Sequence, residues 1–245
     1  MNTASIDVTL RSRDVDYAGR WRMSEMFIAM QELGELHCSR LGYARSQLIQ
    51  KGLIWVLTRV KVEAKRYPKL GDNINITTWP GKTKKTVFPR FYLANDSNGS
   101  LLGAHTLWML VDAKTHQMAM PSKHGVVVEA APDLEPTAAY PGRLSLKGDV
   151  LRREKRRVCY SDLDINRHMN NTRYVEWIYD IIDCKDFDGA AFSDFQINYL
   201  NEARAGDEIS LESRRDGDNI YVHGAKGDVP VFDACARFAK PAPAV

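Results

Sequence analysis

The sequence predicts an α+β fold made of two similar units in tandem, each with a long helix wrapped by a curved antiparallel sheet. Two internal similarities and one pattern support this prediction. A DxD pair precedes a predicted helix twice, so that Asp16 aligns with Asp164. In a second register, further along the chain, Gly71 aligns with Gly206. After each helix the chain shows period-two stretches rich in β-branched and aromatic residues, which is typical of strands. Because both matches are short, chance similarity is the alternative to a true repeat.

The two predicted helices follow the DxD pairs directly. In the first unit the apolar residues at helical spacing are Met23, Met26, Phe27 and Met30. In the second unit a shorter helix is expected to start at a cap formed by Asn170 or Asn171. Its apolar residues at helical spacing are Tyr174, Trp177, Ile178, Ile181 and Ile182.

Strands and turns fill most of the remaining sequence. The strands expected in the first unit are 55–64, 73–82, 87–96 and 101–112, and those in the second are 151–160, 192–200, 208–215, 220–226 and 230–238. The sequence NDSNGS at 95–100 predicts a hairpin turn. Prolines and weak periodicity mark 121–150 as a linker. The predicted units are therefore 1–120 and 151–245.

The composition indicates a globular chain in a reducing compartment. With 245 residues, 44% of them hydrophobic, the chain can bury a real core. No apolar run approaches the roughly 20 residues that span a bilayer, and the polar start lacks the core of a signal peptide. We therefore expect a cytoplasmic protein with no membrane partner. The cysteines form no CxxC pair and are interpreted as buried thiols: Cys38, Cys159, Cys184 and Cys235.

Charge and histidine spacing limit the possible partners and cofactors. A net charge of +3 is too small to favour nucleic acid as a partner, but it permits a basic patch for an acidic protein. The basic runs at 152–157 and 82–85 are either solvated surface or such a docking site. No histidine pair has metal-ligand spacing, so no metal and no other cofactor is predicted.

The residues around the second DxD pair suit hydrolysis of an acyl bond. Asp164, Asn166 and His168 alternate, so in an extended segment their side chains would emerge on one side. His168 can transfer a proton near neutral pH, and Asp164 or Glu202 can orient it or activate water. Asn166 and amides at the helix start can donate to a carbonyl oxygen that becomes negative. Because the first copy retains only Asp16 of this set, only the second unit is predicted to be catalytic.

Structural roles are the alternatives for several polar residues of the motif. Asp162 is expected to make a turn by accepting hydrogen bonds from nearby backbone amides. Asn170 and Asn171 are expected to cap the helix rather than to take part in catalysis. Ser161 lacks a GxSxG context, so a serine-hydrolase elbow is not expected.

The stretch SDLDINRHMNN followed by TRYVEW resembles the signature of acyl-acyl-carrier-protein (acyl-ACP) thioesterases of plant plastids and bacteria. This resemblance covers nearly the whole chain and implies a tandem, or double, hotdog fold with its active site in the C-terminal unit. It implies that Asp164, Asn166, His168 and Glu202 are catalytic. Single-hotdog thioesterases that act on coenzyme A esters carry a looser DxDxxxHxNN pattern. Ala203 stands where plant members have a cysteine, so a thiol mechanism is not implied.

The expected function is release of fatty acids from acyl carrier protein during fatty acid biosynthesis, in a bacterium. A coenzyme A thioesterase of the same fold, a hotdog dehydratase and a non-catalytic acyl-binding sensor are the alternatives. The hydrolysis could proceed by attack of Asp164 or through water activated by Glu202 and His168. The protein could be a monomer or a homodimer. Residues expected to line the acyl tunnel, with core packing as the alternative, are Met23, Met26, Phe27, Met30 and Trp55.

Overall fold

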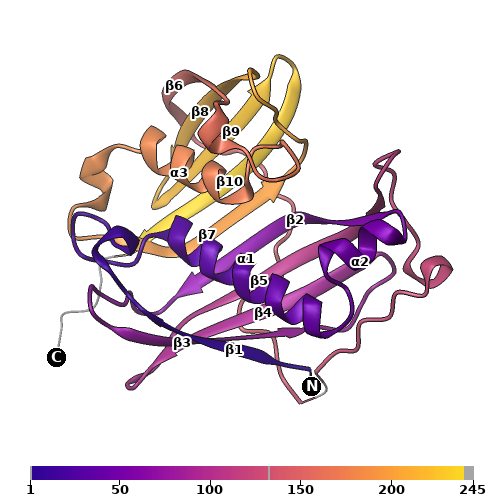
Figure 1. Ribbon diagram of the computed structural model, residues 1–245. Helices are drawn as coiled ribbons and strands as arrows, with labels where there is room; N and C mark the ends of the chain where they lie inside the picture. The colour runs from indigo at the N-terminus through magenta and orange to yellow at the C-terminus, as the bar shows by residue number, and fades with distance from the viewer. Residues whose placement is uncertain (1, 132, 240–245) are drawn as a thin grey trace. The chain divides into compact units, whose positions relative to one another are not determined.

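The computed structural model describes residues 2–131 and 133–239, and its contacts divide the chain into two compact units, Met1–Pro141 and Gly142–Val245. In the described residues each unit has one main helix and a five-stranded antiparallel sheet, so the predicted α+β class is confirmed (Figure 1). Residue 132 and residues 240–245, which the sequence assigned to the linker and to the second unit, lie outside the described part.

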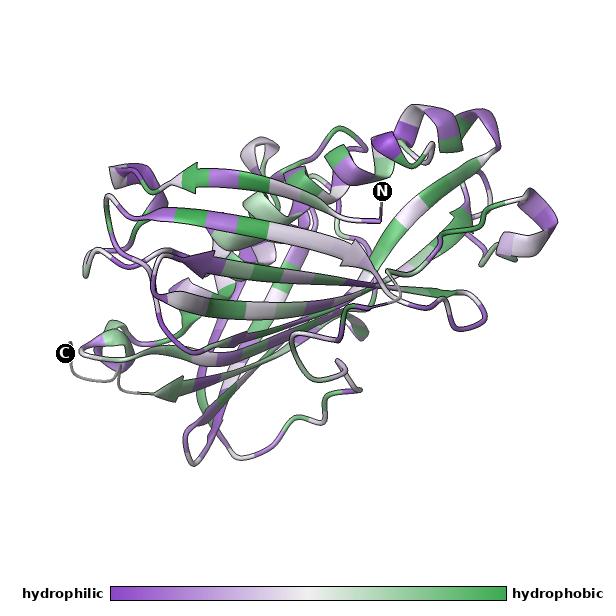
Figure 2. Ribbon diagram, turned by 90° about the horizontal axis from the view of Figure 1, so that it is seen from below, coloured by the Kyte–Doolittle hydropathy of each residue, from purple (hydrophilic) through white to green (hydrophobic). Residues whose placement is uncertain are grey.

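The first unit contains the longer helix and the longer strands. Its strands follow the order β1-β3-β4-β5-β2, and all neighbours are antiparallel. Its elements are β1 (Ala4–Thr9), η1 (Ser12–Asp14), α1 (Met23–Arg40), α2 (Arg45–Gln50), β2 (Leu53–Ala64), β3 (Asn73–Pro80), β4 (Val87–Asp96), β5 (Gly99–Asp112) and η2 (Pro121–His124). Hydrophilic and hydrophobic residues alternate along β1 and β3 (Figure 2), because these strands have one face toward the core, whereas β4 and β5 contain continuous buried runs.

The second unit repeats this plan with a shorter helix. Its strands follow the order β7-β10-β9-β8-β6, again antiparallel throughout. Its elements are β6 (Asp149–Arg157), η3 (Tyr160–Asp162), α3 (Asn171–Ile181), η4 (Cys184–Phe187), β7 (Ala191–Tyr199), β8 (Glu208–Asp216), β9 (Asn219–Lys226) and β10 (Val229–Ala239). All nine predicted strands are present, and their ends lie close to the predicted ones.

Both main helices form for the predicted reasons. The inward face of α1 is buried at the predicted spacing, and Met23 and Met26 are fully covered. Asn170 caps α3, because its Oδ1 accepts hydrogen bonds from the amide and the hydroxyl of Thr172, both at 3.0 Å. The expected hairpin turn closes β4 and β5 with the pair Asp96 and Gly99.

Three features differ from the sequence-based expectations. The edge strand β1 and the short helix α2 were not predicted. The predicted linker is divided, because residues 121–141 belong to unit 1. Within it, a strap formed by residues 133–141 packs on the first sheet, and Thr137 Oγ1 donates to the carbonyls of Tyr92 and Ala104 at 2.7 and 3.1 Å.

The cysteines also differ from expectation. All four have free thiols, but they are not uniformly buried: Cys159 and Cys184 are exposed, and Cys38 and Cys235 are partly covered. Cys159 directly precedes the 3-10 turn η3 and Cys184 begins the 3-10 turn η4, so both lie in turns rather than in the core. No helix in the described part of the chain is long and apolar enough to cross a membrane.

Candidate active site

A tight turn brings Asp164, Asn166 and His168 together. Asp164 Oδ1 accepts from the backbone amides of Asn166 and His168 at 2.8 and 3.1 Å, and its Oδ2 accepts from Asn166 Nδ2 at 3.2 Å. The amide of Asp164 donates to the carbonyl of His168 at 2.8 Å. The prediction of an extended segment was therefore wrong, because the Asp164 carboxylate folds the chain back on itself. Arg167 adopts a left-handed backbone at φ 63° to complete the turn.

The same turn occurs in unit 1, at the position that the DxD repeat aligns with it. Asp16 Oδ1 accepts from the amides of Ala18 and Arg20, both at 2.9 Å, and its own amide donates to the carbonyl of Arg20 at 2.8 Å. Gly19 has the left-handed backbone at φ 73° that Arg167 adopts in unit 2. The two turns thus share their hydrogen bonds as well as their DxD letters.

The second register of the repeat, which aligns Gly71 with Gly206, is also preserved in hydrogen bonds. Asp72 Oδ2 accepts from the amide of Lys69 at 2.8 Å, and in the aligned turn Asp207 Oδ2 accepts from the amide of Arg204 at 2.9 Å. Chance similarity does not produce equivalent bonds at both registers. The predicted internal repeat is therefore confirmed.

Glu202 reaches the site from the turn that precedes β8. A backbone bridge pairs His168 with Arg204, and the amide of Met169 donates to the carbonyl of Ala203 at 2.8 Å. These contacts leave His168 Nε2 3.3 Å from Glu202 Oε2. The side chains are 20% and 37% exposed, so the pair is open to water and to a substrate. All four predicted catalytic residues thus lie in one cluster.

The equivalent cluster in unit 1 lacks this chemistry. Arg20 stands at the position of His168, and its Nε lies 2.9 Å from Asp16 Oδ2. Tyr67 stands at the position of Glu202. A guanidinium stays protonated at all physiological pH values, so it cannot take a proton from water. Unit 1 therefore keeps the scaffold of the site without a general base.

Two further side chains belong to the site in unit 2. Arg204 NH2 lies 3.6 Å from Glu202 Oε2, so it adds positive charge beside the carboxylate. Tyr174 on α3 is buried, and its burial, with the nearby carboxylates of Glu202, Asp207 and Asp164, raises the pKa of its phenol. Neither was among the predicted site residues, and Tyr174 was expected only on the apolar face of the helix. The internal repeat could have drawn attention to Arg204, because the residue that aligns with it in unit 1, Lys69, is also a cation.

The structural roles expected for Asp162 and Asn170 are confirmed, whereas Asn171 is the first residue of α3 and not its cap. Asp162 Oδ2 accepts from the amide of Cys159 at 2.8 Å, which makes the turn before the site. The amide of Thr172, at the start of α3, is occupied by the Asn170 cap. That amide is therefore not available to stabilise an oxyanion, contrary to the expectation for the helix start.

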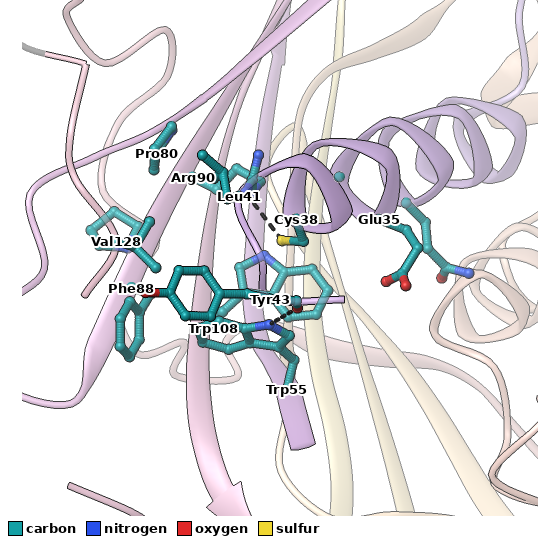
Figure 3. A pocket seen from close by; sticks show the side chains of 13 residues that line it. Glu35, Cys38, Leu41, Tyr43, Trp55, Pro80, Phe88, Arg90, Trp108 and Val128 are labelled. Carbon is teal, nitrogen blue, oxygen red and sulfur yellow. Dashed lines mark hydrogen bonds between the residues drawn. The ribbon is translucent and has the colours of Figure 1, made fainter. Parts of the chain in front are cut away.

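Unit 1 contains a cavity of ≈ 80 Å³ beside α1 (Figure 3). Trp55, one of the five residues expected to contact an acyl chain, lines it together with Phe88 and Trp108. The other four are at most 5% exposed and do not line it: Met23, Met26, Phe27 and Met30. Their packing against the core of unit 1 is the role that the contacts support.

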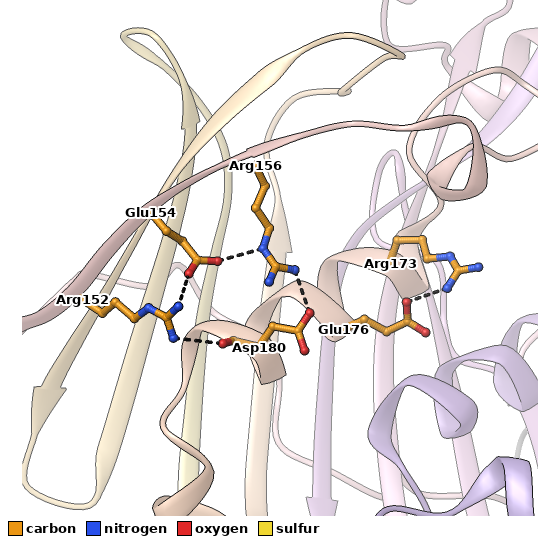
Figure 4. Close-up of polar contacts among 6 residues, drawn as sticks. All are labelled: Arg152, Glu154, Arg156, Arg173, Glu176 and Asp180. Atoms are coloured by element: carbon orange, nitrogen blue, oxygen red, sulfur yellow. Dashed lines mark hydrogen bonds and ion pairs between the residues drawn. The ribbon is translucent and has the colours of Figure 1, made fainter.

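Most cations of the basic run at 152–157 are paired with carboxylates, and Figure 4 shows the pairs of Arg152 and Arg156. Four of its five cations form ion pairs: Arg152 with Glu154, Arg153 with Glu212, Lys155 with Glu208, and Arg156 with Glu154 and Asp180. In the described residues only Arg157 of the run has no carboxylate partner. Lys82, Lys84 and Lys85 lie in unit 1, in the segment between β3 and β4.

Comparison with known proteins gives one consistent family. The profile of the acyl-ACP thioesterase N-terminal domain matches residues 4–123, and that of the C-terminal domain matches residues 148–226. A chloroplastic acyl-[acyl-carrier-protein] hydrolase of Cuphea viscosissima is 26% identical over 235 residues, which are 88% of this chain and 57% of that protein. A chloroplastic palmitoyl-acyl carrier protein thioesterase of Gossypium hirsutum is 26% identical over 214 residues, 81% of this chain and 51% of that protein. The chain thus spans about half the length of the curated relatives it matches.

Solved structures of the family share the fold. An acyl-ACP thioesterase from Bacteroides thetaiotaomicron superposes with a TM-score of 0.89 at 22% identity, covering 97% of this chain and 98% of the other. The 12:0-ACP thioesterase from Umbellularia californica gives a TM-score of 0.84 at 19% identity, covering 98% of each chain. These likenesses confirm the double hotdog fold. With one domain profile of the same family matching each unit, this chain belongs to the acyl-ACP thioesterase family.

Proposed function

We propose that the protein hydrolyses fatty acyl-ACP thioesters to a free fatty acid and holo-carrier protein, in fatty acid biosynthesis. The observation that carries the proposal is the cluster in unit 2, where His168 lies 3.3 Å from Glu202 beside the amide-bearing Asn166. Unit 1 has the same turns with Arg20 in place of the histidine. Membership in a family whose relatives are named as acyl-ACP hydrolases supports the substrate class.

In the proposed mechanism, Glu202 orients the His168 imidazole through its contact with Nε2. His168, or Glu202 itself, takes a proton from a water molecule, and the resulting hydroxide attacks the thioester carbonyl carbon. Asn166 donates a hydrogen bond to the carbonyl oxygen as it becomes negative. The tetrahedral intermediate then expels the thiolate, which receives the proton and leaves as the free thiol of the carrier.

The contacts of Asp164 favour a positioning role over direct attack. Its carboxylate already accepts three hydrogen bonds, from the amides of Asn166 and His168 and from the Asn166 side chain. Hydrogen bonds to a carboxylate lower its nucleophilicity, because they stabilise the charge that would attack. The same backbone bonds are made by Asp16 in the unit without a general base. Activation of water by Glu202 and His168 is therefore the favoured route.

A docking surface for the acidic carrier protein lies around the cluster, rather than along the basic run. Arg157 and Arg167 are exposed and have no carboxylate partner in the described residues. The Arg157 guanidinium lies beside Gly206, in the turn that also holds Glu202. Tyr160 and Ile165, at 91% and 77% exposure, add apolar contact area at the same edge.

The test is release of free thiol from acyl-ACP and from acyl-coenzyme A over a series of chain lengths. The proposal expects faster release from acyl-ACP, and loss of release in His168→Ala. Glu208→Gln is a suitable control, because Glu208 is an exposed carboxylate on β8 that pairs with Lys155 outside the cluster. Absence of thiol release from either thioester would refute the enzyme, and equal rates on both would favour the coenzyme A alternative.

Non-catalytic acyl binding is the second candidate function, and the cavity in unit 1 favours it. Binding of acyl-ACP without turnover, unchanged by His168→Ala, would support that candidate.

A cytoplasmic location is part of the proposal, supported by four cysteines that form no disulfide. The matched plant relatives are chloroplastic proteins.

A further inference from the structure

The residue that follows Glu202 is held at both of its backbone groups. The carbonyl of Ala203 accepts a hydrogen bond from the amide of Met169 at 2.8 Å. The amide of Ala203 donates to the phenol oxygen of Tyr174, a contact that by itself lowers the pKa of the phenol. Ala203 is fully buried, so water does not replace either bond. Because peptide units are planar, these contacts fix the backbone from which the Glu202 side chain extends.

Tyr174 is itself held firmly. It is the fourth residue of α3 and only 3% exposed. Its ring packs edge to face on Tyr199 and on Phe232, with ring centroids 5.5 and 5.3 Å apart. The hydroxyl of Tyr199 also donates to the carbonyl of Asn171, the first residue of α3, at 2.8 Å. The phenol oxygen of Tyr174 therefore has a defined position relative to the turn that contains Glu202.

The phenol of Tyr174 does not suit the role of a proton carrier. Its burial raises the pKa of the phenol, and the carboxylates of Glu202, Asp207 and Asp164 raise it further. The hydroxyl thus stays neutral at physiological pH, far from the value that favours a general base. Any effect of this hydroxyl on the reaction must come through the groups that it holds in place.

The internal repeat supplies the same backbone without this contact. In unit 1 the amide of Trp21 donates to the carbonyl of Pro68 at 3.0 Å, as Met169 does to Ala203 in unit 2. The backbone bridge of His168 with Arg204 likewise has a counterpart, between the residues at positions 20 and 69. The fold of the turn therefore does not require the hydrogen bond from the amide to the phenol.

Both partners of that hydrogen bond are missing from unit 1. Tyr174 aligns with Met26, which is fully buried at the same position of its helix, so packing there does not need a hydroxyl. Ala203 aligns with Pro68, which has no amide hydrogen. Unit 1 also has Tyr67 in place of the site carboxylate. The donor and the acceptor thus occur together in the unit that has a carboxylate to position.

We propose that Tyr174 is a positioning residue, whose hydroxyl holds the amide of Ala203 and so keeps the Glu202 carboxylate 3.3 Å from the His168 imidazole. The Glu202 side chain is 37% exposed, so its direction depends on the backbone that carries it. This role rests on the proposed hydrolysis, in which Glu202 and His168 act together. A shift of about 1 Å in such a pair can lower the rate by about 10²-fold.

The first test is a double-mutant cycle on thiol release from acyl-ACP. Tyr174→Phe keeps the ring contacts, and we expect it to lower kcat by about 10–100-fold with KM changed less than about twofold. In the Glu202→Gln background the same change should lower kcat by less than about twofold, because the hydroxyl acts only through Glu202. A wild-type kcat in Tyr174→Phe, or an equal loss in both backgrounds, would overturn the proposal.

Two further variants guard this cycle against effects on folding. Tyr174→Met introduces the residue that unit 1 has at the aligned position, and it should give the same two results as Tyr174→Phe. Tyr179→Phe is the matched control, because it removes a hydroxyl from the same helix on a ring that stacks on Phe187 at 5.0 Å. We expect Tyr179→Phe to keep kcat within about twofold of the wild type, and circular dichroism checks the fold of each variant.

The second test needs no turnover. Amide hydrogen exchange, followed by NMR on the full chain, should be at least about tenfold faster at Ala203 in Tyr174→Phe than in the wild type, because the amide loses its acceptor. The amide of Ile178, inside α3, should exchange at an unchanged rate. Absence of thiol release from the wild type would refute the proposed hydrolysis, whereas unchanged exchange at Ala203 would overturn the role of Tyr174.

Discussion

At the scale of single residues, the structure separates two roles that the sequence could not distinguish. Asp164 and Glu202 are both carboxylates beside His168, but Asp164 is bound to backbone amides whereas Glu202 faces the imidazole. Glu202→Gln should therefore lower kcat by about 10²–10⁴-fold, the usual range for a lost general base. Asp164→Asn should cost less than about tenfold, because an asparagine oxygen can still accept the turn amides. Steady-state thiol release measures both, and a larger loss for Asp164→Asn would identify Asp164 as the nucleophile.

The backbone of the catalytic turn allows a paired test of strain. Arg167 has the left-handed conformation at φ 63° that Gly19 adopts at φ 73° in unit 1. A side chain in this conformation costs roughly 1 kcal/mol, partly offset by the greater flexibility of unfolded glycine. Arg167→Gly should raise the free energy of unfolding by up to about 1 kcal/mol, and Gly19→Arg should lower it by about 1 kcal/mol. No atom lies within 4 Å of a Cβ added at Gly19, so conformation alone is tested. Urea unfolding that moves both variants in one direction would contradict this account.

At the scale of elements, the apolar periodicity of the sequence predicted the main helices and most of the strands. It missed short elements and turns, whose conformation depends on local hydrogen bonds. The two main helices and nine of the ten strands in the described residues were predicted. The edge strand β1 and the helix α2 are both short, so neither has enough residues for a pattern to stand out. The internal repeat could have predicted β1, because β1 precedes the first DxD pair in the same way that β6 precedes the second. The segment with Asp164 was expected to be extended, because alternating polar residues suit both an extended segment and a turn.

The strap of residues 133–141 could not be predicted from apolar periodicity either, because it contains no helix or strand. It packs so closely on β5 that a Cβ at Gly103 would lie 2.0 Å from the carbonyl oxygen of Thr137. Gly103→Ala should therefore lower the free energy of unfolding by about 1–3 kcal/mol, the usual cost of overpacking, and make the strap more sensitive to protease. Gly142→Ala is the matched control, because a Cβ there meets nothing within 4 Å. Equal free energies of unfolding for the two variants would show that the strap can move away from the added methyl group without loss of stability.

At the scale of the whole molecule, the chain uses one scaffold twice and places the candidate hydrolytic residues in one copy. The repeated turns predicted the two units, and the differences between copies predicted Asn166, His168 and Glu202 as the candidate site. The surface charge was harder to predict, because a run of basic letters says nothing about its neighbours. Carboxylates from β8 and α3, far away in the sequence, neutralise cations of the run 152–156. Only the folded chain shows which cations remain unpaired.

This charge distribution makes a prediction about carrier recognition by the whole protein. Arg157→Gln and Arg167→Gln should each raise KM for acyl-ACP by about 3–10-fold, because each removes an unpaired cation beside the site. The kcat on acyl-ACP and the rates on acyl-coenzyme A should change little. Arg153→Gln is the matched control, since Arg153 is already paired with Glu212. KM for acyl-ACP should also rise with salt, and less steeply in the Arg157 and Arg167 variants. A larger effect from Arg153→Gln would assign docking to the basic run instead.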